Sequence, residues 1–171
     1  MAVGNRYALW LAPSPDSAQA LAQPMTWLRQ QFGGPAFAPH VTLLGRITGE
    51  ESLLVARTNE LAHRLHRQRL PIGPVSGEVY YFRCLYAVLD KSEPLLQAHA
   101  DALSVFGYNA RDDYLPHISL WYGQLDGDEK GRLRSAISIR LPEAIDVDRL
   151  QLVHITVDVA GWRVVAEAEL G

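Results

Sequence analysis

Apolar residues occur along this chain in two patterns, short continuous runs and recurrences at helical spacing. Runs bounded by polar or turn-forming residues predict strands. Tyr81–Leu89 is almost uninterrupted, which is typical of a central strand covered on both faces. The predicted strands are Tyr7–Ala12, Phe37–Gly45, Tyr81–Leu89, Tyr114–Tyr122, Leu150–Val159 and Arg163–Ala168. The last two are expected to form a hairpin that turns at Ala160-Gly161.

Four segments between these runs have the spacing and end signals of helices. The first contains Pro24, which is expected to kink or split it. The second follows a capping-box pattern from Thr48 to Glu51, and the third opens at Ser92 and stops at Gly107. The predicted apolar faces are Leu21, Met25, Leu28 and Phe32; Leu54, Thr58, Leu61 and Leu65; Leu95, Leu96, His99, Leu103 and Phe106; and Leu133 and Ile137, which follow a cap at Asp126. The prolines and glycines between residues 70 and 79 favour an edge strand or a loop there.

The predicted elements follow the order βαβαβ twice, with extra strands at the end. A shift of 77 residues aligns Tyr7–Ala12 with Cys84–Leu89, and Phe37–Leu43 with Tyr114–Leu120. In the second pair of segments every aligned position is identical or chemically similar, running aromatic, small or aliphatic, Pro, His, β-branched, hydroxyl, Leu. The pattern predicts a single domain, residues 1–171, built from two duplicated lobes about a pseudo-twofold axis.

Composition narrows the class of protein. Of the 171 residues, 48% are hydrophobic, which is enough for a substantial core. The formal net charge of −3 argues against binding long nucleic acid by phosphate neutralisation alone. The single cysteine, Cys84, excludes an internal disulfide framework, favours a reducing compartment, and is expected to be buried and inert. The apolar run near the start, about six residues, is too short for a secretory core or a membrane span, so we expect a cytoplasmic protein.

The residues with the clearest chemistry lie in the repeated block. Alternation along a strand places His40 and Thr42 on one face, and His117 and Ser119 repeat this arrangement. If the lobes face each other, two imidazoles and two hydroxyls converge on one cleft. Two histidines with an ordinary pKa near ~6.5 can act as base and acid, while hydroxyls hold anionic oxygens. These groups suit in-line displacement at phosphorus without a metal.

A single His-x-[Thr/Ser] pattern is weak evidence, because a histidine on a strand face is usually structural. The pattern occurs a third time at His154-Ile155-Thr156, without the preceding aromatic-x-Pro and outside the repeated block. We expect this third copy to be structural. Two copies in matching seven-residue blocks, one in each half, favour catalysis.

The doubled motif in a chain of this size resembles the two-histidine phosphoesterase superfamily. Within it, the chain is most similar to the small cyclic phosphodiesterases that open ADP-ribose 1″,2″-cyclic phosphate and nucleoside 2′,3′-cyclic phosphates. The resemblance spans about Tyr7 to Trp162 and is strongest in Tyr7–Trp10, Phe37–Gly45, Tyr81–Tyr86 and Pro116–Gly123. It implies a bilobal α+β fold with two pseudo-twofold-related lobes, antiparallel or mixed sheets flanking a central groove, helices outside, and no metal or other cofactor.

The resemblance also implies roles for individual residues. His117 corresponds to the base that activates water, and His40 to the acid that protonates the departing ribose oxygen, with the roles exchanged in the reverse direction. Thr42 and Ser119 correspond to hydroxyls that bind the phosphate oxygens. Tyr122 matches a tyrosine that contacts the phosphate in relatives.

Further residues are candidates for the groove wall. Trp10 matches an aromatic residue that, in the family this chain resembles, lies at the cleft edge and can stack on a base. Arg83 either reaches outward from its apolar run or faces the anionic groove, and Tyr81 is an aromatic candidate that a core position explains equally well. Weaker candidates are Tyr80 and Tyr114 for the wall and Arg46 and Arg111 for a second phosphate. The remaining histidines, His63, His66 and His99, are expected to be solvated or hydrogen-bonded in the core.

Three functions are open at this point. The leading one is metal-independent hydrolysis of small cyclic nucleotide phosphates, giving the 1″-phosphate from ADP-ribose 1″,2″-cyclic phosphate and the 2′-phosphate from nucleoside 2′,3′-cyclic phosphates. The second is RNA 2′,3′-cyclic phosphodiesterase or 2′–5′ ligase activity on RNA ends, which the net charge disfavours unless Arg57–Arg69 forms a local basic patch. The third is a nucleotide-binding module without catalysis. We expect a monomer that uses neither long nucleic acid nor a membrane as partner.

Overall fold

The computed structural model describes residues 5–171, in which seven strands form one sheet in the order β1-β2-β5-β4-β3-β6-β7, with a further pairing between β1 and β6. All the described pairings are antiparallel. The strands are β1 (Arg6–Pro13), β2 (Val41–Ile47), β3 (Gln68–Ser76), β4 (Leu85–Leu89), β5 (His117–Trp121), β6 (Ala144–Ile155) and β7 (Arg163–Glu169). The helices are α1 (Pro15–Phe32), α2 (Glu51–Ala62), α3 (Glu93–Phe106) and α4 (Gly127–Ser138), with short 3₁₀ turns η1 (Tyr81–Arg83) and η2 (Val159–Gly161).

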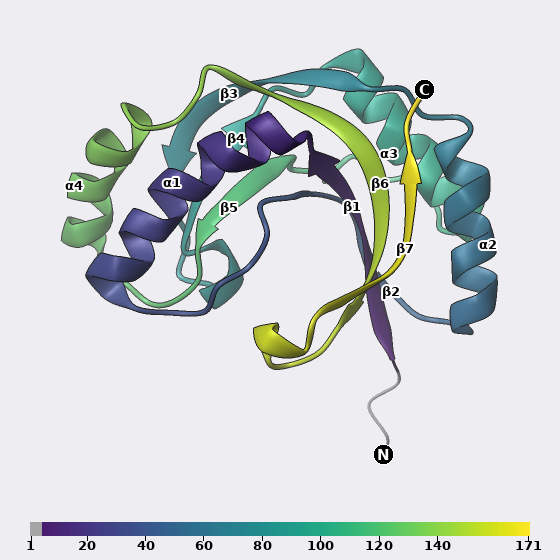
Figure 1. Cartoon of the computed structure of the whole chain (residues 1–171), viewed down its shortest axis with the longest axis horizontal. Helices are drawn as coiled ribbons and strands as arrows, with labels where there is room; N and C mark the ends of the chain where they lie inside the picture. Colours follow the sequence, from purple (N-terminus) through teal and green to yellow (C-terminus); the bar gives the residue numbers. More distant parts are fainter. Residues whose placement is uncertain (1–4) are drawn as a thin grey trace.

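The strands divide into two lobes that share the long strand β6. One lobe contains β2, β1, the later part of β6, and β7, and the other contains β5, β4, β3 and the start of β6. Helices α2 and α3 pack on the first lobe and α1 and α4 mainly on the second, so the pairs lie at opposite ends of the molecule (Figure 1). The expected bilobal α+β fold with helices outside is confirmed.

A pseudo-twofold axis relates the lobes. The elements β1-α1-β2-α2-β3 recur in the same order as β4-α3-β5-α4-β6. Two strand pairings join equivalent residues of the two halves: Val41 pairs with Ile118, and Arg69 pairs with Asp146, 77 positions further along the chain. The axis therefore passes through both pairs, and the first pair lies between the two histidine motifs.

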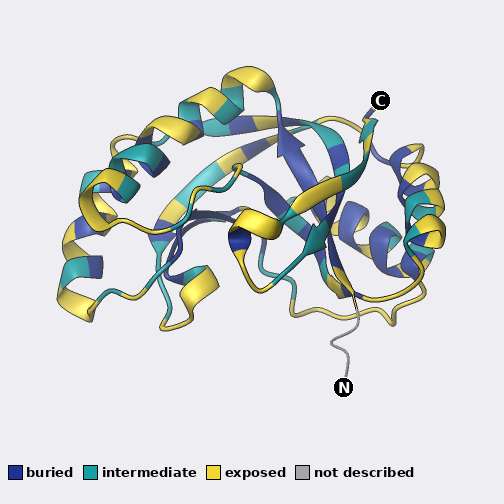
Figure 2. Cartoon of the chain, turned by 60° about the horizontal axis from the view of Figure 1, so that its bottom comes forward, coloured by how far each residue is buried: buried dark blue, intermediate teal, exposed yellow. Residues whose placement is uncertain are grey.

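Alternation along β1 separates the core from the opposite face of the sheet. Tyr7, Leu9 and Leu11 are buried in the large core that includes residues of all four helices. Ala8 and Trp10 point the other way and form a small separate cluster with Val153. Helices therefore cover one face of this lobe, and buried residues lie along the strands and the inward faces of the helices (Figure 2).

Several predicted boundaries are corrected by the structure. Helix α1 continues through Pro24, which is itself buried, so the helix is not split. Helix α2 begins after Glu50 rather than at Thr48 and has no side-chain cap. The strand expected to begin at Phe37 begins at Val41, and Tyr81–Leu89 opens with the turn η1 before β4.

The segment after α2 is also corrected. Strand β3 lies between β4 and β6 in the sheet and is therefore not a loop, but its start, residues 68–71, pairs with β6 and its later part, from Ile72 to Ser76, pairs with β4. The caps at Ser92 and Asp126 and the left-handed glycine at Gly107 are confirmed. Within residues 5–171, no helix is both long enough and apolar enough to cross a bilayer.

Candidate active site

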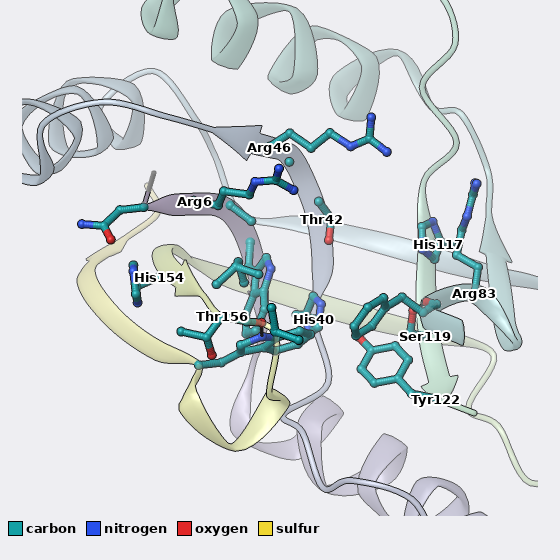
Figure 3. Close-up of a pocket in the computed structure, with 18 residues that line it drawn as sticks. Arg6, His40, Thr42, Arg46, Arg83, His117, Ser119, Tyr122, His154 and Thr156 are labelled. Carbon is teal, nitrogen blue, oxygen red and sulfur yellow. Dashed lines mark hydrogen bonds between the residues drawn. The ribbon is translucent and has the colours of Figure 1, made fainter. Parts of the chain in front are cut away.

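The two histidine motifs meet where the lobes join. Strands β2 and β5 share a single residue pair, Val41 with Ile118, and both side chains are fully buried. In an antiparallel pair, the flanking residues on the opposite face lie across from one another. This register sets His40 opposite Ser119, and it sets Thr42 opposite His117. All four side chains line one pocket, as the sequence predicts (Figure 3).

Each histidine is held by the backbone of its own motif. Nδ1 of His40 lies 2.8 Å from the carbonyl oxygen of Ala38, and Nδ1 of His117 lies 2.8 Å from that of Leu115. A carbonyl oxygen can only accept, so each Nδ1 carries the proton and donates it. Nε2 of each ring is left for the pocket, and in the neutral imidazole it is a proton acceptor.

The surroundings of His40 favour its neutral form. The pKa of His40 is lowered to about 4, chiefly by burial and to a smaller extent by the positive charge of a protonated His117, while the hydrogen bond to Ala38 acts in the opposite direction. The indole of Trp10 lies flat against the imidazole, with ring centroids 3.6 Å apart and an interplanar angle of 9°. An indole face attracts a positive charge, so this stack favours the imidazolium that forms if His40 takes up a proton from solvent when an anion binds beside it.

His117 is less buried and lies beside a polar network. Burial lowers its pKa, Arg83 lowers it further, and the bond to Leu115 and the carboxylate of Glu78 raise it. Glu78 accepts a hydrogen bond from the hydroxyl of Tyr86 at 3.1 Å and pairs with Arg83 at 3.2 Å. The ring of Tyr86 meets His117 edge-on. Glu78 therefore connects the arginine and tyrosine that flank this histidine, a connection that the sequence alone did not reveal.

Three hydroxyl groups surround the space between the histidines. Ser119 Oγ donates to the carbonyl of Phe82 at 3.3 Å, and the Thr42 hydroxyl makes no hydrogen bond with another described residue. Tyr122 is buried, its ring is stacked on Phe37 at 3.8 Å, and burial raises the pKa of its hydroxyl. A phenol that stays protonated is a donor to an anionic oxygen. Tyr122 lies next to Ser119, as its predicted role requires (Figure 3).

The pocket has a volume of about 900 Å³ and an unusual charge balance. Its described lining includes three arginines, Arg6, Arg46 and Arg83, and three histidines, His40, His117 and His154, but no Asp or Glu. The chain as a whole carries a net charge of −3. Cationic and donor groups are thus concentrated in one concave site, which suits a small anionic ligand.

The aromatic wall differs from the sequence-based expectation. Trp10 lines the pocket as expected, but it is 5% exposed and one face of its ring is stacked on His40. Tyr81 packs beside Tyr122 and does not line the pocket. Phe82 and Trp162, from opposite lobes, line it in addition to Trp10, with ring centroids 6.0 Å apart. Trp162 follows η2 in the connection between the hairpin strands, a place that no strand pattern in the sequence brings near Phe82.

The other candidates lie further from the histidine pair. His154 lines one end of the pocket, and its ring packs edge-on against the core residue Tyr7, in agreement with a structural role. Arg111 pairs with Asp113 and is not part of the pocket lining.

Nδ1 of His99 donates to the Leu43 carbonyl, which confirms a hydrogen-bonded core histidine. His63 and His66 are exposed and Cys84 is buried. Tyr80 is exposed, and Tyr114 donates from its hydroxyl to the Thr42 carbonyl.

The arrangement has the parts of an acid–base site for an anion. Two nitrogens can accept or donate a proton on opposite sides of a pocket, and hydroxyls lie between them. The described residues contain no group of three or more His, Cys, Asp or Glu side chains placed to hold a metal ion.

Comparison with known proteins places this geometry among related chains. The model of a family described as cyclic phosphodiesterase-like protein matches residues 5–170. A cyclic phosphodiesterase of Arabidopsis thaliana is 27% identical over 126 residues, which cover 72% of this chain and 68% of that protein.

Solved structures agree in fold over nearly the whole chain. The crystal structure of E. coli LigT complexed with 3′-AMP has a TM-score of 0.63 at 15% identity and covers 97% of this chain and 98% of LigT. TT0787 of Thermus thermophilus has a TM-score of 0.62 at 18% identity and covers 96% of this chain and 97% of TT0787. At these identities the likeness establishes a common fold.

Proposed function

Because this chain belongs to the cyclic phosphodiesterase-like protein family, we propose that its pocket hydrolyses small cyclic nucleotide phosphates with His40 and His117 as an acid–base pair. Family membership makes the chain a phosphodiesterase of the two-histidine phosphoesterase superfamily that acts on cyclic phosphates. The proposed substrates are ADP-ribose 1″,2″-cyclic phosphate and nucleoside 2′,3′-cyclic phosphates. Family membership alone does not establish these substrates or the roles of individual residues, which are part of the proposal.

One observation supports the proposal most directly. Two imidazoles, related by the pseudo-twofold axis, are anchored in the same way through Nδ1 and leave Nε2 for a pocket without a described carboxylate. Because both rings can be neutral with Nδ1 as the donor, Nε2 of either ring can act as a base. An anion bound between the rings would favour protonation of the second ring, which could then act as the acid. A cyclic phosphate diester supplies that anion.

In the proposed reaction, His117 takes a proton from water as the water oxygen attacks phosphorus. His40, protonated when the anionic substrate binds, gives its proton to the leaving ribose oxygen. From a nucleoside 2′,3′-cyclic phosphate, the P–O3′ bond breaks and the 2′-phosphate is released. From ADP-ribose 1″,2″-cyclic phosphate, the P–O2″ bond breaks and the 1″-phosphate is released. Protons then exchange with solvent and reset the pair.

The hydroxyls have a separate task in this reaction. Thr42, Ser119 and Tyr122 line the pocket, and in this proposal their hydroxyls donate to the non-bridging oxygens as charge shifts onto them in the transition state. Arg83 lines the same part of the pocket and is fixed by Glu78, so its positive charge is held near the phosphate. Fixed donors cost little reorganisation during the reaction.

The proposal is tested by a substrate panel with ³¹P NMR, which identifies the position of the phosphate in each product. His40→Ala and His117→Ala should each lower kcat by about 10²–10⁴-fold, the usual contribution of a positioned acid or base. His63→Ala, an exposed histidine that donates only to the Asn59 carbonyl, is the matched control and should keep full activity. EDTA should have no effect on turnover. Full activity in either pocket variant would rule out the acid–base pair.

A further inference from the structure

Two arginines of the pocket have no partner among residues 5–171. Arg6 and Arg46 are exposed pocket residues, and neither makes an ion pair or a hydrogen bond with another described residue. Arg83, in contrast, is paired with Glu78. Arg6 and Arg46 come from neighbouring antiparallel strands, β1 and β2. In Figure 3 both lie on the same side of His40, beyond Thr42.

The backbone of Arg46 is strained in a way that directs its side chain. Tyr7 pairs with Ile47 and Leu9 with Leu44, so two residues of β2, Gly45 and Arg46, stand opposite the single residue Ala8. This is a β-bulge, a feature that re-aims side chains near functional sites. Within this bulge Arg46 has a left-handed backbone conformation, with φ of 57°. It is the sole non-glycine residue with positive φ among the described residues. Such a conformation costs about 1–3 kcal/mol, and residues that keep it cluster at ligand sites.

The distance from the histidines fits a second group on the same ligand. Arg6, Ala8 and Trp10 alternate along β1 and all face the pocket, and Trp10 is stacked on His40. Four residue steps along a strand separate the backbones of Trp10 and Arg6 by about 13 Å. Arginine side chains can extend over part of this length, and Ala8, which lies between Arg6 and Trp10 on the pocket face, has a side chain too small to block it.

We propose that Arg6 and Arg46 form a second anion subsite that binds another phosphate of the substrate, such as a 5′-phosphate or a diphosphate attached to the ribose. The subsite binds the phosphate at the 5′ end of the ribose, while the reacting cyclic phosphate lies between the histidines. The position of the reacting phosphate rests on the proposed function. Guanidinium groups bind phosphate through paired charge-assisted hydrogen bonds, and these two have no described carboxylate to compete. The enzyme would therefore prefer ligands with two phosphate positions.

Equilibrium binding tests the subsite without requiring turnover. Titration calorimetry would compare adenosine 2′-phosphate with adenosine 2′,5′-bisphosphate at one ionic strength. The wild-type protein should bind the bisphosphate at least about tenfold more tightly, since a charge-assisted contact is typically worth that factor or more. Arg6→Gln and Arg46→Gln should each remove most of this preference. Arg132→Gln, an exposed arginine of α4 outside the pocket, carries the same change of charge and should keep it.

Arg46→Gly separates binding from folding. Glycine adopts positive φ without strain, so this variant should be at least as heat-stable as the wild type while it loses the bisphosphate preference. Equal affinity for the two ligands in the wild type, no binding of either ligand, or an unchanged preference in both the Arg6 and Arg46 variants would overturn the subsite. A retained preference in a protein that turns over no cyclic phosphate would instead overturn the proposed function and leave the subsite standing.

Discussion

His40 shows at the scale of one residue how neighbours prepare a side chain for reaction. The Ala38 carbonyl fixes its tautomer, the Trp10 ring fixes its plane, and burial lowers its pKa to about 4. A proton on this ring is therefore unfavourable in the free protein and becomes favourable beside a bound anion. The acid would be charged mainly when substrate is present.

The lowered pKa of His40 predicts a loss of stability as pH falls. In the unfolded chain a histidine has a pKa of ~6.5, whereas the pKa of His40 in the folded protein is about 4. Between these values the unfolded state binds more protons, so the free energy of unfolding decreases as the pH is lowered, by about 3 kcal/mol over the window. His40→Asn, whose amide can still donate to the Ala38 carbonyl, should show a shallower decrease in urea denaturation at pH 7, 5.5 and 4.5.

Part of this slope should remain in His40→Asn, because burial also lowers the pKa of His117. His63→Asn, a substitution at an exposed histidine, should reproduce the slope of the wild type. If His40→Asn also follows the wild-type slope, His40 is not held neutral in the folded state.

The residues of the site differ in how far the sequence alone predicts them. The four motif residues were predictable because the pattern occurs twice and strand alternation sets their common face. The position of Trp10 was predictable, but its stacking on His40 depends on how β1 and β2 approach in space. Arg6 shares the alternation of Ala8 and Trp10, a signal that could have placed it on the pocket face. The orientation of Arg46 depends on a bulge that no local pattern announces.

At the scale of elements, β3 shows why turn-forming residues can occur within a sheet. Pro74 lies in the register shift between Ile72 and Val75, where regular pairing with β4 is interrupted. A Cβ atom on Gly73 would come within 2.9 Å of the Val88 carbonyl oxygen, so glycine allows β3 to approach β4 closely. Prolines and glycines usually indicate a sheet edge, and here Gly73 and Pro74 lie in the part of β3 that is paired only with β4, although the strand as a whole lies between β4 and β6. Only the neighbouring strands reveal this.

The close approach of β3 and β4 predicts an effect of Gly77→Ala. A Cβ atom on Gly77 would lie 2.4 Å from the Cys84 carbonyl oxygen, so the backbone around η1 must shift. Overpacking of this kind typically costs about 1–3 kcal/mol, which urea denaturation would measure. Because η1 carries Phe82 and Arg83 into the pocket, kcat/KM for a cyclic nucleotide should fall as well.

Gly131→Ala is the matched control for this effect. Gly131 lies in α4, and a Cβ atom there would meet nothing within 4 Å. Alanine in an open helical position stabilises a protein by up to about 1 kcal/mol relative to glycine. Equal stability of the Gly77→Ala variant and the wild type would show that the β3–β4 junction can absorb the methyl group without strain.

At the scale of the whole molecule, symmetry assembles the site from two halves. Each half supplies one histidine and one hydroxyl, and the axis passes through Val41 and Ile118 between them. The bilobal fold was predictable because all the repeated elements kept their order at one sequence offset. An internal duplication is the origin we propose for this symmetry. Strand β7 has no counterpart in the first half, and the connection that leads to it from β6 supplies Trp162 to one side of the pocket.

The distribution of charge over the molecule predicts a preference for small substrates. The arginines between residues 57 and 69 lie on α2 and the segment after it, and none of them lines the pocket of the histidines. Helix α2 packs on the core face of the β1 lobe, whereas the pocket lies on the opposite face. An RNA whose cyclic end occupies the pocket would have to pass around the lobe to reach this basic segment.

We therefore expect kcat/KM for an oligonucleotide with a 2′,3′-cyclic end to be within about tenfold of that for the matching mononucleotide, a difference of about 1.4 kcal/mol. Added salt should reduce both values by similar factors, because few phosphates beyond the pocket would be contacted. Steady-state kinetics at several salt concentrations measure this directly. Arg64→Gln combined with Arg67→Gln should change neither the ratio of kcat/KM for the oligonucleotide to that for the mononucleotide nor its dependence on salt. A much higher kcat/KM for the oligonucleotide, lost steeply with salt and in that double variant, would instead identify RNA ends as the substrate, because only a polynucleotide is long enough to reach both the pocket and the basic segment.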